Sequence, residues 1–208
     1  MRYFKERPLL LLSLICIAIF IPHLDALWVN VMEARNFVTA REMLQDSNWL
    51  LTTLNGEPRY QKPPLPTWLS AGSALLFGVK SVFAMRIPAA IITIVLILIS
   101  YTFSKKLTGN TRYAFISSLI LATSFFIVFS GRNGQWDIFT HGFMMAAIYQ
   151  FYLFFSTPEK KHKRILLAAL FFGCSFMSKG PVSLYALLLP FLIAYGFVFK
   201  FKKVTKSV

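Results

Sequence analysis

The chain has 208 residues, of which 56% are hydrophobic and only 14% are charged, and its mean hydropathy is +0.60. This composition is too apolar for a soluble domain of that length. A soluble protein with a net charge of +14 would be expected to bind nucleic acid. Here, however, Lys and Arg form short clusters between apolar runs. That pattern is typical of membrane topology, so we predict an integral membrane protein with no nucleic-acid partner.

A helix needs about 20 mostly apolar residues to cross the hydrocarbon core of a bilayer. Segments near that length lie at residues 8–28, 82–104, 113–130, 136–156, 165–178 and 182–198. We predict that all of them are helices, because a helix satisfies its backbone hydrogen bonds within one segment. The predicted fold is therefore all-α and membrane-spanning, a single transmembrane domain over residues 1–208.

The basic clusters predict the orientation of these spans. They lie within residues 2–7, 105–112, 160–164 and 200–206. Six spans place all of these clusters on the same side, and the positive-inside rule assigns that side to the cytoplasm. We expect a multi-pass protein of the cytoplasmic (inner) membrane, with the N-terminus and the C-terminus in the cytoplasm.

The segment 29–81, between the first two predicted spans, is far longer than a usual connection and is expected outside. Residues 30–45 can form a helix, and residues 55–58 (Asn-Gly-Glu-Pro) signal a turn. Residues 65–77 are apolar but short for a span, so we expect an amphipathic helix in the outer interface with Trp68 as its anchor. A span there would invert every later loop and put the Lys clusters outside.

Charged and polar residues from separate segments are expected to meet at this outer interface. They are Glu33, Arg35, Arg59, Tyr60, Lys62, Arg86, Arg132, Asp137 and Lys179. Each could simply be solvated, and Arg86 and Lys179 could extend to the lipid headgroups. Ionisable groups at span ends nevertheless favour a shared functional pocket. Many cations with a carboxylate suit attack on a sugar whose leaving group is a lipid phosphate, with the carboxylate as general base.

A series of short runs appears in a specific order along nearly the whole chain. The runs are residues 32–35 (MEAR), 40–44 (AREML), 54–57 (LNGE), 62–69 (KPPLPTWL), 86–89 (RIPA), 136–137 (WD) and 178–181 (SKGP). In this order they resemble the membrane-embedded glycosyltransferases of the GT-C fold that use polyprenyl-phosphate-linked sugars. That family includes the lipid A aminoarabinose transferase and the protein O-mannosyltransferases, and the resemblance is to its N-terminal portion.

The resemblance implies a polyprenyl-phosphate-linked sugar donor, catalysis on the outer face and a base at the start of the outer loop. The family's catalytic Asp position holds Met32, which cannot accept a proton. We therefore favour Glu33 as the base, with Asp137 or Asp25 as alternatives, or else activity is lost. Lys62 occupies the family position that contacts the lipid phosphate.

Metal binding is left open by the sequence. Some family members have an acid before the lysine that helps hold a metal, but this chain has Gln61 there. Asp137 and His141 share a helix face at i, i+4 and could hold a divalent metal, although a polar pair lining a cavity is the favoured interpretation. We assign no cofactor, and a divalent metal stays a possibility.

We therefore predict a glycosyltransferase that moves a sugar to a lipid, glycan or protein acceptor on the outer face. Glu33 and Asp137 are the catalytic candidates. The substrate-binding candidates are Arg35, Arg59, Tyr60, Lys62, Arg86, Arg132 and Lys179. Membrane lipids are the expected partners besides donor and acceptor. Family members are longer, so the chain is expected to be a truncated reading frame, a fragment or one part of a split protein, and to be inactive alone. The alternative is a non-catalytic lipid-phosphate-binding or transport protein, but a transporter would place its charges near the bilayer midplane.

Overall fold

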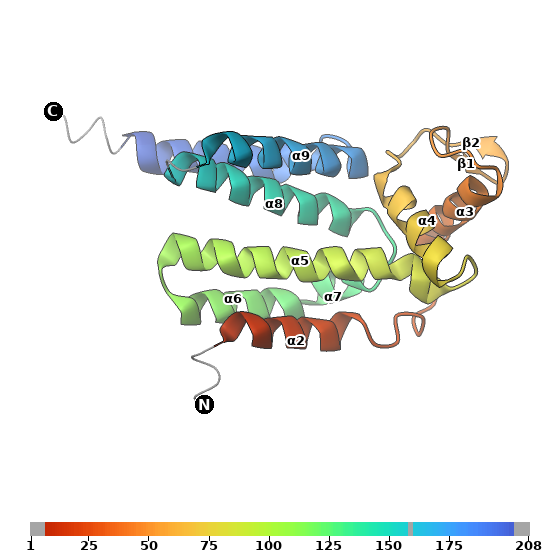
Figure 1. Ribbon diagram of the computed structural model, residues 1–208, viewed down its shortest axis with the longest axis horizontal. Coiled ribbons are helices and arrows are strands. Elements are labelled where there is room, and N and C mark those ends of the chain that lie inside the picture. The colour runs from red at the N-terminus through yellow and green to blue at the C-terminus, as the bar shows by residue number, and fades with distance from the viewer. Residues whose placement is uncertain (1–6, 158–159, 202–208) are drawn as a thin grey trace.

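The computed structural model describes residues 7–157 and 160–201 and confirms the predicted helical fold. A bundle of roughly parallel and antiparallel helices carries a smaller group of elements at one end (Figure 1). The bundle contains α2 (Pro8–Phe20), α5 (Val82–Thr108), α6 (Thr111–Thr123), α7 (Phe125–Gly131), α8 (Asp137–Ser156), α9 (Lys161–Lys179), the π-helical segments η1 (Leu184–Leu188) and η2 (Gly196–Phe201), and α10 (Leu189–Tyr195) between them.

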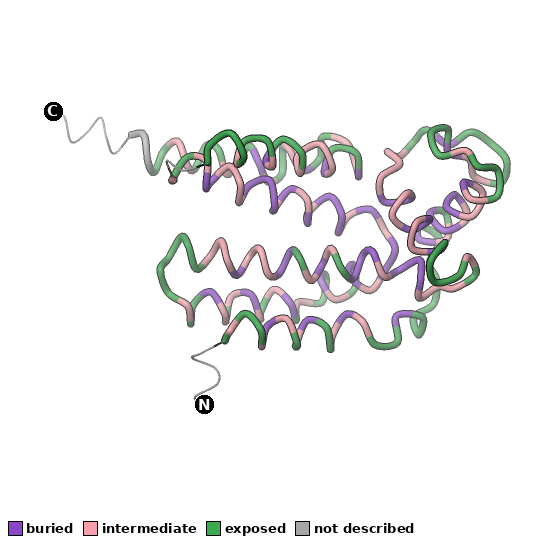
Figure 2. The backbone as a smooth tube through the Cα atoms, viewed as in Figure 1, coloured by how far each residue is buried: buried purple, intermediate pink, exposed green. Residues whose placement is uncertain are grey.

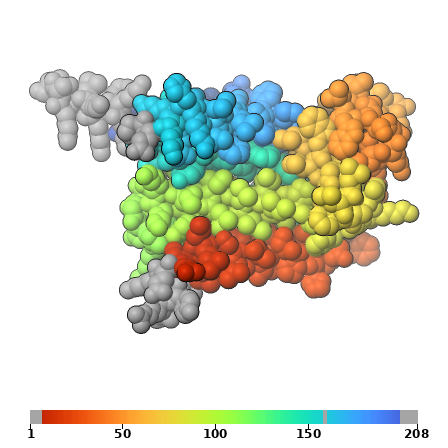
Figure 3. Space-filling view, in the orientation of Figure 1, coloured from red at the N-terminus to blue at the C-terminus, as the bar shows by residue number. Residues whose placement is uncertain are grey.

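The elements at the other end form what we call the end group. It contains α3 (Val31–Gln45), α4 (Leu65–Phe77) and a short antiparallel hairpin of β1 (Thr53–Leu54) and β2 (Glu57–Pro58), in which Thr53 pairs with Pro58. In the space-filling view the end group covers one end of the bundle (Figure 3). The expected helices 30–45 and 65–77 and the turn at 55–58 are thus confirmed within one or two residues.

The bundle is organised around α5, which contacts α2, α4, α6, α7 and α8. Its core packs Cys16 and Phe20 of α2 against small and branched residues of α5 such as Ala89 and Ile97, all without exposed surface. Figure 2 shows burial along the inward faces and exposure along the outer ones. Many of the exposed residues are large and apolar, for example Leu166 at 72%. Such an outer surface fits a lipid environment.

Two helices, α5 and α8, are long and apolar enough to cross a membrane, and α6 with α7 makes a third candidate if the bent pair is one span. We expected one continuous helix over residues 113–130. It is instead broken and bent by 64° between α6 and α7. Ser124 lies at the break with an extended backbone (φ −66°, ψ 137°), and its hydroxyl donates to the carbonyl of Leu121. Ser and Thr side chains compete with the helical ladder in this way.

The first predicted span is also shorter as a helix than expected. Residues 8–28 were predicted as one segment, but α2 ends at Phe20 and the chain turns over the next residues. Pro22 has no backbone N–H and cannot continue the helix. Conversely, α5 and α9 extend beyond the predicted 82–104 and 165–178.

A proline inside α5 leaves one carbonyl of this helix free for a hydrogen bond from α4. Pro88 cannot donate to the carbonyl of Ala84 four residues earlier. The hydroxyl of Ser73 on α4 donates to that carbonyl instead, at 2.6 Å. The end group is therefore joined to the central helix by a hydrogen bond that the helix itself cannot make.

The described basic clusters lie at the end of the bundle opposite the end group. α2 and α9 begin there and α5 ends there (Figure 1). These helix ends carry Arg7, Lys105, Lys106, Lys161 and Lys163. Cluster residues within 1–6 and 202–208 lie outside the described residues. The described clusters thus share one end, as the predicted topology requires.

Candidate functional site

A buried ion pair connects the end group to the bundle. The two Glu33 carboxylate oxygens accept from Arg86 Nε at 2.6 Å and Arg86 Nη2 at 2.7 Å, and both side chains are fully buried. The N–H of Gly134, in the loop between α7 and α8, donates to Glu33 Oε1 at 2.8 Å. α3, α5 and this loop therefore meet on one carboxylate.

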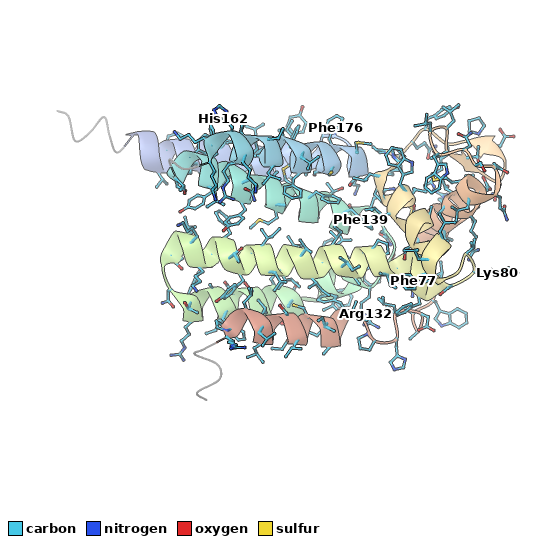
Figure 4. All side chains as sticks on the ribbon, viewed as in Figure 1. Phe77, Lys80, Arg132, Phe139, His162 and Phe176 are labelled. Carbon is cyan, nitrogen blue, oxygen red and sulfur yellow. The ribbon has the colours of Figure 1, made fainter. Side chains whose placement is uncertain are left out.

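Arg86 and Arg132 hold the turn that follows α2. Arg86 Nη1 donates to the carbonyls of Leu24 at 2.5 Å and Leu27 at 3.0 Å. Arg132 donates to the carbonyls of Ile19, Pro22 and His23 at 2.6 to 2.8 Å, and Figure 4 shows it beside this end of α2. These carbonyls lie in the last turn of α2 and just beyond it, where a helix lacks donors for its carbonyls, so the two guanidiniums supply donors there.

These contacts differ from the arrangement that the sequence led us to expect. We expected Glu33 to act as the base, but here it has no exposed surface and its oxygens are occupied by Arg86 and Gly134. We expected Arg86 and Arg132 to bind substrate, but their donors are directed at protein carbonyls and, for Arg86, at Glu33. In this arrangement both oxygens of Glu33 are engaged by protein donors.

A second polar cluster was missed by the sequence analysis. The Asn36 amide donates to the carbonyl of Gly134 at 3.0 Å and accepts from the hydroxyl of Thr67 on α4 at 2.7 Å. Asn36 is fully buried and lies one helical turn after Glu33. That i, i+3 spacing of two polar residues on one helix face was a signal for a buried polar contact.

The remaining candidates converge on a cavity of about 460 Å³. Its lining includes Arg59, Tyr60, Lys62 and Lys179, so it joins the segment before α4 to the end of α9. Next to it is a smaller cavity of about 250 Å³, lined by Arg35, Glu57, Arg59 and Gln61 among others. Because Arg59 and Gln61 line both cavities, the two hollows adjoin each other.

The hairpin places the segment 59–64 in this position. Asn55 and Gly56 form its turn, with φ +56° and +79°, which is the turn chemistry that favours a two-residue hairpin loop. Glu42 of α3 accepts from the Thr53 hydroxyl at 2.5 Å and from the Asn55 N–H at 2.6 Å. The Arg59 N–H then donates to the carbonyl of Thr52 at 2.8 Å, which fixes the start of the cavity wall.

Arg59 forms the floor between the two cavities. Its Nη1 donates to the carbonyl of Arg35 at 2.9 Å and to the hydroxyl of Thr39 at 2.8 Å, and its guanidinium lies 5.0 Å from the centroid of the Trp136 ring. Burial, and next the neighbouring Arg35 charge, lower the pKa of Arg59 from its usual value. These contacts hold the Arg59 side chain in place. Tyr60, by contrast, is 70% exposed.

Asp137 is an accessible acid beside the larger cavity, and Glu57 lines the adjoining smaller one. Asp137 starts α8 and forms an ion pair with Lys179, the last residue of α9. Both side chains are about one third exposed, at 32% for Asp137 and 30% for Lys179. Lys179 lines the larger cavity, so Asp137 is joined to the cavity wall through this ion pair.

The donor set does not fit a metal ion. Within residues 7–157 and 160–201, no group of three or more His, Cys, Asp and Glu is placed to hold one. Gln61, at the family's metal-related position, lines both cavities with an amide instead of a carboxylate. No chemical step is therefore routed through a metal.

Comparison with known proteins identifies the family. The family model described as dolichyl-phosphate-mannose-protein mannosyltransferase matches residues 61–207. The chain is 30% identical over 202 residues to the undecaprenyl phosphate-alpha-4-amino-4-deoxy-L-arabinose arabinosyl transferase 1 of Proteus mirabilis, covering 96% of this chain and 37% of that protein. A transferase of the same name from Pseudomonas savastanoi is 27% identical over 176 residues, which cover 82% of this chain and 32% of that protein. The chain thus spans about a third of the length of these relatives.

Two solved structures share the fold. ArnT from Cupriavidus metallidurans bound to undecaprenyl phosphate aligns with a TM-score of 0.79 at 20% identity, over 91% of this chain and 35% of that one. The Archaeoglobus fulgidus oligosaccharyltransferase aligns with a TM-score of 0.63 at 14% identity, over 86% of this chain and 24% of that one. These matches confirm the expected GT-C fold. Together with the family match, they show that this multi-pass membrane chain belongs to the dolichyl-phosphate-mannose-protein mannosyltransferase family.

Proposed function

We propose that this chain is part of a membrane glycosyltransferase that moves a sugar from a polyprenyl-phosphate donor to an acceptor. The observation that carries the proposal is the larger cavity, where Arg59, Tyr60, Lys62 and Lys179 come together from the end group and α9. The names of the Proteus and Pseudomonas relatives, and the undecaprenyl phosphate bound to ArnT, point to the same class of donor.

The cations suit the leaving group of this reaction. An acceptor hydroxyl attacks the anomeric carbon of the sugar, the bond from that carbon to the phosphate oxygen breaks, and the polyprenyl phosphate leaves with the bonding electrons. Lys62 and Lys179 would stabilise the charge that develops on the phosphate. Phosphate is already a good leaving group, so one carboxylate is enough, and direct displacement inverts the anomeric centre.

We assign Asp137, in preference to Glu33, as the general base that takes the proton of the acceptor hydroxyl. Asp137 is partly exposed and is held beside the cavity by Lys179, whereas Glu33 is enclosed by Arg86 and Gly134. Changing Asp137 to Asn should lower sugar transfer by about 10²–10⁴-fold while leaving donor binding within a few fold. Equal transfer rates for Asp137→Asn and the unchanged protein would rule out this assignment.

The proposed topology places the end group on the outer face and both termini in the cytoplasm. It rests on the described basic clusters, which lie at the end opposite the end group. The spans proposed are the six segments predicted from the sequence, with the third bent at Ser124. The catalytic loop is then residues 29–81, on the side where lipid-linked donors are consumed.

Binding of a polyprenyl phosphate tests the cavity directly. The purified full chain in detergent should bind a polyprenyl phosphate more tightly than the matching polyprenol, which lacks the phosphate. Changing Lys62 to Met removes one charge-assisted contact and should weaken phosphate binding by about tenfold or more. The matched control is Lys80→Met, because Lys80 is exposed on the end group outside the cavity (Figure 4).

Two outcomes would count against the proposal. Equal binding of the phosphate and the polyprenol would exclude a phosphate site, and equal losses in Lys62→Met and Lys80→Met would reduce Lys62 to general surface charge. Transfer is measured in a longer relative that shares the cavity residues, because the chain alone is expected to be inactive. Binding without any transfer by that relative, in membranes supplied with a polyprenyl-phosphate sugar and acceptor, would favour the non-catalytic alternative, a lipid-phosphate-binding or transport protein.

A further inference from the structure

A further cavity lies at the opposite end from the candidate site. It has a volume of about 830 Å³ and is formed by the start of α2, the last turns of α5 and Tyr149 of α8. No residue that we place in the sugar-transfer reaction lines it. The lining of this cavity therefore has a role separate from sugar transfer.

The charge of this cavity is entirely positive. Arg7, Lys105 and Lys106 line it, and no acid does among the lining residues within 7–157 and 160–201. Among residues 7–157 and 160–201, none of these cations forms an ion pair. Clustered cations without a counterion repel one another, so an anion bound among them would be favoured.

A buried hydroxyl supplies a second, independent sign of a ligand. Tyr101 is 3% exposed and lines the cavity, and its hydroxyl has no hydrogen-bond partner in the described part of the chain. Buried polar atoms are nearly always satisfied by protein, water or ligand. Lys105 follows Tyr101 by one helical turn, so the orphaned donor and the charge lie on one face of α5.

Part of the remaining wall is apolar and, in the proposed topology, lies at the depth of lipid headgroups. Leu9 and Leu10 of α2 contribute it, at 43% and 52% exposure. α5 has 27 residues, which corresponds to about 40 Å of helix. A bilayer measures about 30 Å across its hydrocarbon core and 40–45 Å with its headgroups. Lys105 and Lys106, in the last turn of α5, therefore reach the level of the lipid phosphates.

We propose that this cavity binds an anionic glycerophospholipid such as phosphatidylglycerol. The phosphate lies among Lys105, Lys106 and Arg7 and accepts a hydrogen bond from the Tyr101 hydroxyl, and an acyl chain follows the Leu9 and Leu10 surface. Basic pockets between spanning helices are a known way to hold such headgroups. The proposal is independent of the reaction assigned to the other end of the molecule.

The test is retention of phosphatidylglycerol by the purified full chain, measured by native mass spectrometry against phosphatidylcholine. The chain should retain phosphatidylglycerol preferentially. Near a membrane surface each lysine contributes about fivefold to binding of an anionic lipid, so Lys105→Gln with Lys106→Gln should lower retention by about 25-fold. Tyr101→Phe removes only the hydroxyl and should lower it by about tenfold.

The matched control is Lys161→Gln with Lys163→Gln, which removes the same charge at the same end but outside the cavity. The melting temperature of each variant in detergent identifies any variant that fails to fold. If Lys105→Gln with Lys106→Gln fails to fold, Tyr101→Phe still tests the proposal. Equal retention of both lipids, or equal losses in the control, would overturn the proposal. Release of the lipid by millimolar inorganic phosphate would also overturn it. The same holds if a polyprenyl phosphate binds more tightly than phosphatidylglycerol and Tyr101→Phe weakens that binding.

Discussion

Replacing Arg86 with Met keeps much of the side-chain volume but removes the guanidinium. The carboxylate of Glu33 is then left buried, with the Gly134 N–H as its remaining described donor. The carbonyls of Leu24 and Leu27 also lose a donor. Breaking a buried ion pair by removing one partner costs about 3–5 kcal/mol, because the other charge stays desolvated. We expect a loss of that size for Arg86→Met.

Thermal unfolding of the purified chain in detergent measures this loss. For proteins of 150–250 residues, one kcal/mol corresponds to about 2–4 °C, so the expected decrease in Tm is about 6–20 °C. Glu33→Gln should also lower Tm, because one of its two acceptor oxygens becomes an amide that points donors at the Arg86 donors. Retention of polyprenyl phosphate by the variant fraction that stays folded should be unaffected.

A double substitution separates the charge effect from loss of packing. Glu33→Leu with Arg86→Met replaces both ions with apolar side chains, which is often nearly neutral for buried pairs. The double variant should therefore be more stable than Arg86→Met alone, a coupling that a double-mutant cycle measures. An unchanged Tm for Arg86→Met would refute a structural role for the ion pair. A Glu33→Gln variant with a normal Tm and abolished sugar transfer would also refute it, and would restore Glu33 as the base.

Two further predictions concern the loop before α8 and the topology. Gly134→Ala should destabilise the chain by about 1–3 kcal/mol through overpacking, since its Cβ would lie 2.5 Å from Phe37 Cε1; Gly72→Ala, where a Cβ meets nothing within 4 Å, should be neutral or stabilising in a Tm measurement. An impermeant thiol reagent applied to intact cells should label a cysteine placed at Asn55 and not one at Lys161, and labelling of Lys161 alone would invert the proposed topology.

The local elements of the end group were predictable because each has its own signal. Asn30 accepts from the Glu33 N–H as a helix cap, and Gly78, with φ +107°, ends α4. Such capping depends on residues a few positions apart. That the described basic clusters share one end of the bundle was predictable for a similar reason, since charge at span ends depends little on the detailed packing.

The roles of the charged residues were not predictable in the same way. A carboxylate and a guanidinium can serve a ligand or each other, and the sequence separates Glu33 from Arg86 by 53 residues. Only the packing of α3 on α4, and of α4 on α5, brings the two side chains together and decides between these uses. Trp68 illustrates the same point: we expected an anchor facing the interface, but it is half-buried and its indole N–H donates to the carbonyl of Trp49 at 2.6 Å.

The carboxylate that joins three segments also sets an order of events during synthesis. Its oxygens are satisfied by Arg86, 53 residues further along, and by Gly134, 101 residues further along. At a synthesis rate of about 5–20 residues per second, Glu33 waits roughly 5–20 s for the last of these partners. The end group therefore cannot close when its own residues have been made. Its completion therefore requires that α5 and α7 have already been made, so this early segment matures only after part of the bundle that follows it in the sequence.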